Sequence, residues 1–160
     1  MALFSSQKKL DAEKELREKL AGNPILDMLL EGAAKKEFAW ITAADGYYDN
    51  CRREILLEND YAGFGRKNGY DEKTKKEGVQ YEGISYTSLG WKPMSELPTS
   101  SGNYVSEKRV FEIWGSLITE RMKKTYPRLE FGDPVTCTEN GKLHLTISYR
   151  VPQKEYRSWS

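Results

Sequence analysis

The chain has 160 residues, of which 38% are hydrophobic, 12% aromatic and 31% charged, and its formal net charge is +1. This length supports one domain with a substantial core, and the aromatic content is too high for a disordered chain. A net charge so close to zero provides no overall attraction to nucleic acid or to an anionic membrane. We therefore expect one folded domain over residues 1–160.

Two cysteines, Cys51 and Cys137, lie far apart in the sequence. A secreted domain held by disulfides usually has more cysteines at closer spacing, so we expect both thiols to be reduced and buried. The first residues contain a short apolar run, which lacks the length of a signal-peptide core. No segment approaches the roughly 20 apolar residues of a membrane span. These features favour a cytoplasmic protein that does not bind membranes.

The N-terminal part predicts two helices. Leu10, Leu16 and Leu20 recur at roughly helical spacing among charged residues. This narrow apolar stripe predicts a helix over residues 1–22 that either packs weakly or projects, and that could pair with a second copy of the chain. Gly22-Asn23-Pro24 ends this helix and begins another, which together form an expected helical hairpin. The second helix has a wide apolar face made of Ile25, Leu26, Leu29, Leu30, Ala33 and Ala34.

The next segment is short, aromatic and β-branched. Residues 38–42 therefore predict a strand, although they could also extend the second helix. Asp45-Gly46 follows, and we predict a helix from there through Leu57. Its inward face would hold Tyr48, Cys51, Ile55 and Leu56.

Residues 59–104 are the least regular part of the sequence and contain most of its glycines. Asn68-Gly69 and the polar run over residues 71–78 are turn signals. Short alternating stretches flank Gly83, where a bulge or bend is expected. We predict irregular structure across this segment.

The C-terminal third has the clearest patterns. A helix is predicted from Ser106, its N-cap, to Tyr126-Pro127, where proline ends it. A β-hairpin follows over residues 134–138 and 143–151 around Asn140-Gly141, and residues 152–160 form a tail. The predicted fold class is α+β: a small, mostly antiparallel sheet with helices on one face.

One glycine-rich stretch, Gly63 to Gly69, resembles a phosphate-binding loop only superficially. Its glycine spacing differs from the dinucleotide fingerprint, and it lacks the strand before it and the helix after it that this chemistry requires. We interpret it as a flexible surface loop.

Asp45 and Asp49 are spaced by four residues, so a helix would place both carboxylates on one side. Such a pair could bind a divalent ion or share acid and base roles. Capping of the predicted helix also explains both residues, and we favour that interpretation.

His144 is the chain's one histidine, so a site with several histidine ligands cannot form within one copy. Cys137 is its expected neighbour across the hairpin. Strand alternation predicts that His144 faces solvent while Cys137 faces the apolar side, which would separate a potential nucleophile from its base. We therefore expect no metal site and no cofactor.

Aromatic and basic residues interleave in the middle of the chain. Tyrosine and tryptophan provide large contact areas at low entropic cost, so this segment is the best candidate for recognition. The same aromatic residues could instead fill the core beneath an irregular segment. The predicted binding residues are Phe64, Arg66, Lys67, Tyr81, Tyr86 and Trp91.

These observations predict a non-enzymatic binding or regulatory protein that acts through a protein partner. A first alternative is nucleic-acid binding by the lysines and arginines of the middle segment, stacked with its aromatic residues. A second is a small enzyme that uses carboxylates such as Asp45 and Asp49.

Overall fold

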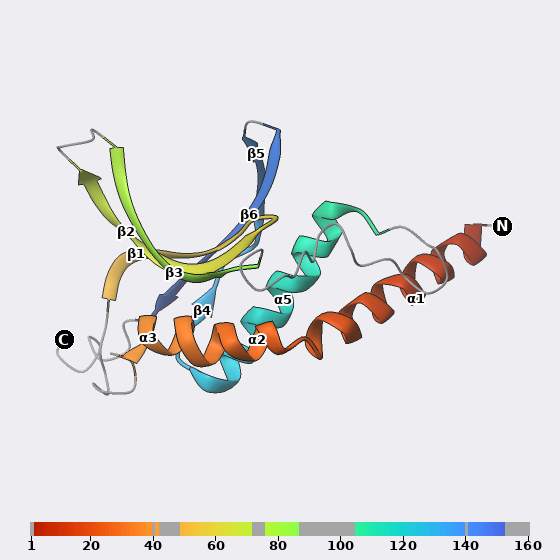
Figure 1. Cartoon of the computed structure of the whole chain (residues 1–160), viewed down its shortest axis with the longest axis horizontal. Helices are drawn as coiled ribbons and strands as arrows, with labels where there is room; N and C mark the ends of the chain where they lie inside the picture. The colour runs from red at the N-terminus through yellow and green to blue at the C-terminus, as the bar shows by residue number, and fades with distance from the viewer. Residues whose placement is uncertain are drawn as a thin grey trace, which may run out of the picture.

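The computed structural model describes residues 2–39, 41, 49–71, 76–86, 105–139 and 141–152. An antiparallel sheet forms one layer, and the helices cover one of its faces (Figure 1). The predicted α+β class is therefore confirmed. No helix in the described ranges has both the length and the apolar character needed to span a bilayer.

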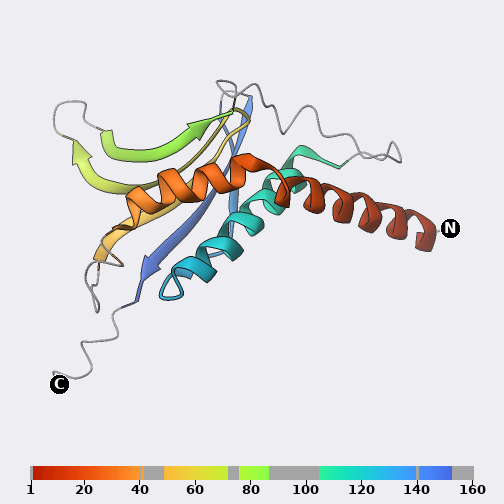
Figure 2. The same cartoon turned by 60° about the horizontal axis from the view of Figure 1, so that its bottom comes forward.

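Helix α1 (Ala2–Ala21) and the next helical segment follow one another along the chain with a bend between them (Figure 2). Asn23 caps the second segment, because its side chain accepts a hydrogen bond from the Ile25 N–H at 2.9 Å. The two do not fold back as the expected hairpin. Instead α1 packs on α5 through Leu16 and Leu20, while Leu10 is 58% exposed where α1 extends outward.

The second helical segment consists of α2 (Pro24–Met28), a π-helical stretch η1 (Leu29–Ala34) and α3 (Lys35–Glu37). Most of its predicted apolar face is buried, and Leu30 and Ala33 are partly buried. The expected strand over residues 38–42 is wrong, because Ala39 and Ile41 are helical and the Ile41 N–H bonds the Phe38 carbonyl. Phe38 has no exposed surface and packs against Phe64 and Tyr149. Its aromatic character thus reflects core packing under the sheet.

Strand β1 (Asp49–Leu57) occupies the segment predicted as a helix. Arg53, Ile55 and Leu57 are buried, whereas Glu54 and Leu56 between them are partly exposed. This period of two is the strand pattern, and helix-favouring side chains obscured it. Pairing with β2 on one side and β6 on the other outweighs the local helix propensity of this segment.

Strands β2 (Tyr61–Asp71) and β3 (Lys76–Ser85) form a long hairpin in the segment predicted to be irregular. Asn68-Gly69 lies inside β2, at a shift in the pairing register between Lys67 and Tyr70. The Asn-Gly pair therefore coincides with an irregularity in the strand pairing and does not form a turn between strands. The presumed glycine loop from Gly63 is also part of β2, so the flexible-loop interpretation is wrong.

Helix α5 (Glu107–Thr125) is present as predicted, with Ser106 accepting a hydrogen bond from the Arg109 N–H at 3.3 Å. The C-terminal hairpin is also confirmed as β5 (Val135–Glu139) and β6 (Lys142–Val151), and Gly141 has the positive φ of 76° that this turn requires. Short strand β4 (Glu130–Phe131) pairs with the far end of β6.

The sheet order is β3-β2-β1-β6-β4, with β5 also paired to β6. Helix α5 lies over β6, and η1 lies over β2 and β3, so both cover the same face. Gly115 allows this close approach, since a Cβ there would contact the Ile147 side chain at 2.9 Å. The core between the layers centres on Trp114, Phe111, Phe38 and Phe64.

Candidate functional site

The opposite side of the sheet, which we call the helix-free face, carries none of the described helices (Figure 1). Strand alternation and register place side chains there from β1, β2, β3 and β6. They include acidic, phenolic and imidazole groups within a few residue positions of one another. The members described in detail below are Glu54, Glu58, Tyr61, Tyr81 and His144, which we call the Tyr–Glu cluster.

Tyr81 and Glu54 lie on strands separated by β2. Gly65 stands between them in the register, opposite both residues. Because glycine has no side chain, the Tyr81 hydroxyl reaches across β2 and donates a hydrogen bond to the Glu54 carboxylate. Burial raises the pKa of Tyr81, and the hydrogen bond and charge of Glu54 raise it further. The phenol therefore stays protonated and fixed at neutral pH.

Tyr61 begins β2 after a tight turn, in which the Glu58 N–H bonds the Tyr61 carbonyl at 2.8 Å. Its ring and hydroxyl lie over Gly63 and Gly83, where an added Cβ on either glycine would collide with them. Burial raises the pKa of Tyr61, with smaller contributions from the charges of Glu82 and Glu58. Two glycines on neighbouring strands thus provide the flat surface on which this ring rests.

His144 and Glu58 form the third element of the cluster. The His144 Nδ1 lies 3.6 Å from the Glu58 Oε1, and the His144 side chain is 20% exposed. His144 therefore lies on the polar, helix-free face as predicted, although most of its side chain is covered. Cys137 is directly opposite His144 in the register, so the two share a face, contrary to the predicted separation. Cys137 is an exposed free thiol, which also corrects its expected burial.

The cluster combines aromatic rings with acceptor oxygens. Neutral phenols with raised pKa values are poor bases at neutral pH, so the two tyrosines are suited to contact and hydrogen bonding. Among the described residues, no group of three metal-ligating side chains is close enough to hold an ion. The arrangement is suited to a cation, which carboxylates and ring faces both attract.

The residues predicted for binding are divided by the sheet. Phe64 and Tyr86 are fully buried on the covered face, where the Trp114 Nε1–H donates to the Tyr86 hydroxyl at 2.6 Å. Tyr81 is half-buried on the helix-free face. Arg66 and Lys67 belong to β2, but their side chains lie outside the described part of the structure, as does Trp91 altogether.

Sequence reasoning missed Glu54, Glu58 and Tyr61 as site residues. Glu54 was assigned to a helix that ended at Leu57, so its alternation with buried neighbours was not recognised, and Glu58 lay beyond the end of that helix. A usable signal was present in Tyr61-Ala62-Gly63-Phe64-Gly65, where glycines replace side chains on one face of an aromatic strand. Such gaps leave space for neighbouring aromatic rings.

The alternative carboxylate pair does not have the helical geometry assumed for it. Asp49 is the first residue of β1, and Asp45 lies outside the described residues. The capping interpretation of Asp49 is therefore wrong, because no helix begins there.

Comparisons with protein-family models, with curated proteins and with solved structures gave no match to this chain.

Proposed function

We propose that this chain is a non-enzymatic binding protein that acts through a protein partner. Its helix-free face binds a lysine or arginine side chain of that partner. The observation that carries the proposal is the hydrogen-bonded pair of Tyr81 and Glu54 beside Tyr61. A cation at this place would contact carboxylate oxygens and aromatic rings together.

The fixed geometry of the tyrosines supports binding. Tyr81 is held by Glu54, and Tyr61 is held over Gly63 and Gly83. Side chains that are already ordered lose little conformational entropy on association, so more of the contact energy is retained. Tyrosines in such partly desolvated positions are frequent energetic centres of protein interfaces.

The charges of the described side chains also support a cationic partner. Glu54 and Glu58 are acidic and partly exposed, whereas Arg150, a cation of the same face, is already paired with Glu130 at 3.1 Å. A phosphate backbone would be repelled by these carboxylates. This favours a protein partner over the nucleic-acid alternative, which depends on lysines and arginines such as Arg66 and Lys67, whose side chains lie outside the described part of the structure.

The proposal is tested by placing a photo-crosslinking residue at Ser148, an exposed neighbour of Glu54 in the register. The matched control carries the same residue at Glu120, on the helical side. Both are exposed to lysate of the source cells with and without nuclease. We expect one protein to be crosslinked from Ser148, regardless of nuclease, and not from Glu120.

Two further variants test whether the crosslinked partner contacts the Tyr–Glu cluster. Glu54→Gln and Tyr81→Phe, each combined with the Ser148 crosslinker, should lower the yield of that product. A product that is unaffected by both variants, or that disappears with nuclease, would contradict the proposal. In that case the chain would contact its partner elsewhere or through nucleic acid.

A further inference from the structure

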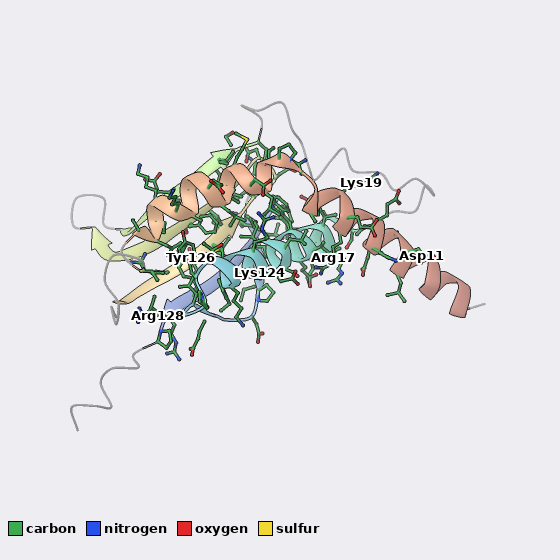
Figure 3. The ribbon with its side chains drawn as sticks, turned by 90° about the horizontal axis from the view of Figure 1, so that it is seen from below. Asp11, Arg17, Lys19, Lys124, Tyr126 and Arg128 are labelled. Carbon is green, nitrogen blue, oxygen red and sulfur yellow. The ribbon has the colours of Figure 1, made fainter. Side chains whose placement is uncertain are left out.

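A pocket lies on the opposite side of the molecule, between the η1–α3 segment and the last turn of α5. Its volume is about 370 Å³, in the range of small-molecule sites. Tyr126, which follows α5, is labelled there in Figure 3. The lining residues are Leu30, Glu31, Lys35, Ala39, Arg121, Thr125 and Tyr126.

The π-helical stretch η1 shapes one wall of the pocket. The Lys35 N–H bonds the Leu30 carbonyl, which is the i to i+5 pairing of a π-helix. This wider turn brings Leu30 and Lys35 to nearly the same side, so that an apolar and a cationic group both line the pocket. Short π-helical stretches are less stable than α-helix and frequently occur at functional sites.

The pocket has an apolar surface in addition to its charges. Leu30 is partly buried, and Tyr126 is 5% exposed with its ring 5.1 Å from that of Phe38. Burial raises the pKa of Tyr126, so its phenol is neutral at physiological pH. Leu30, Ala39 and Tyr126 can therefore contact the hydrocarbon part of a ligand.

Both signs of charge line the same pocket. Arg121 donates to Asp27 at 2.6 Å, and its guanidinium retains further N–H donors. Lys35 and Glu31 are exposed, and neither takes part in the ion pairs found among the described residues. With Asp27 offsetting Arg121, the lining is close to neutral but has a cation and an anion available. A ligand with one charge would leave the opposite pocket charge unmatched.

We propose that this pocket binds a small zwitterion, namely a free α-amino acid with an apolar side chain. The ligand carboxylate binds Lys35 and Arg121, its ammonium binds Glu31, and its side chain lies on Leu30, Ala39 and Tyr126. This site is independent of the helix-free face, because it lies on the covered side of the sheet.

The test uses calorimetry with three probes that share one aromatic ring. Phenylalanine carries both charges, phenylpropionate only the carboxylate, and phenethylamine only the ammonium. We expect phenylalanine to bind at least about tenfold more tightly than either of the others, which corresponds to one lost charge contact of about 1.4 kcal/mol. Amide NMR shifts should concentrate at Leu30, Ala39 and Thr125.

Substitutions of the charged pocket residues test which contacts the ligand makes. Lys35→Met and Glu31→Gln should each weaken phenylalanine binding about tenfold. Lys124→Met serves as the control, because Lys124 is an exposed cation of the same helix end that does not line the pocket. Circular dichroism checks that each variant is folded. Equal affinity for phenylpropionate, unchanged binding in Glu31→Gln, or no binding of phenylalanine would each overturn the proposal.

Discussion

Charged side chains on the two faces of the sheet differ in burial and in their partners, as two consecutive residues of β1 show. Arg53 points to the covered face, is 2% exposed and forms an ion pair with Glu37 of α3. Glu54 points to the helix-free face and accepts from Tyr81. One ion pair fastens a helix to the sheet inside the core, whereas the other interaction remains accessible to a partner.

This difference follows from what covers each face. Charges inside the core cost several kcal/mol to desolvate, and losing one partner leaves the other unpaired. On the helix-free face, water still reaches the carboxylate, so the same loss costs little. Changes on the covered face should therefore alter stability, while changes in the Tyr–Glu cluster should alter binding.

The largest expected effect is loss of the fold at alkaline pH. Burial raises the pKa values of Tyr86 and Tyr149 on the covered face above 10.0. The folded state holds these protons more tightly than the unfolded chain. The stability they provide is therefore present below pH 10.0 and is lost as the pH rises above it.

Urea unfolding at increasing pH measures this loss directly, and the tyrosinate absorbance reports which phenols ionise. We expect the buried tyrosines to ionise together with unfolding. Ionisation of all tyrosines near pH 10.0 in a protein that remains folded would mean that these phenols are not buried as described.

The next largest effect is expected for Glu37→Ala. This change leaves the Arg53 guanidinium buried without its carboxylate, and it should lower the free energy of unfolding by about 3–5 kcal/mol. Urea unfolding is the measurement. Glu82→Ala is the control, because its ion pair with Lys36 is exposed and should contribute about 0–1 kcal/mol. Equal effects of the two changes would remove the distinction between buried and exposed pairs.

Two tyrosine-to-phenylalanine changes compare the faces more finely. Tyr86→Phe leaves the Trp114 N–H without its acceptor in the core, so we expect a loss of about 1–3 kcal/mol. Tyr81→Phe removes a half-exposed hydroxyl and should cost less. Thermal and urea unfolding of both variants, followed by circular dichroism, would show the order. A larger loss for Tyr81→Phe would reverse the roles assigned to the two faces.

The smallest effect is expected for Cys137→Ser on the helix-free face. Its side chain is exposed, so stability should stay within about 0.5 kcal/mol. The thiol should react with a water-soluble reagent in the folded protein, without denaturant. Protection of Cys137 until unfolding would show that this part of the face is covered.

The predictable parts of the fold were those with strong local signals. Ser106, the wide apolar face of α5 and the Asn140-Gly141 turn each determine structure within a few residues, and the corresponding helix and hairpin are confirmed. The helix prediction failed over residues 49–57 because Arg52, Arg53 and Glu54, followed by Leu56 and Leu57, resemble a helical segment by residue type. The buried alternation of Arg53, Ile55 and Leu57 becomes meaningful only once β2 and β6 are known to pair with it.

The candidate site was harder to predict than the fold. Tyr81 was identified from its residue type, but its partner Glu54 is distant in sequence and meets it through Gly65 on a third strand. Phe64 and Tyr86 were chosen for the same aromatic character, yet they lie on the other face. Residue type predicts that an aromatic group matters, whereas strand register decides whether it is core or surface.

The position of β6 has a consequence for how the chain reaches this structure during synthesis. It is the last of the described strands, yet it pairs with β1 on one side and with both β4 and β5 on the other. Until residues 142–151 leave the ribosome, β1 has an open edge and Leu57 and Ile55 lack the strand beside them. Such late, long-range pairing slows folding and exposes an edge that can pair with other chains. Nascent chains that stop before β6 are therefore expected to depend on chaperones and to aggregate when released.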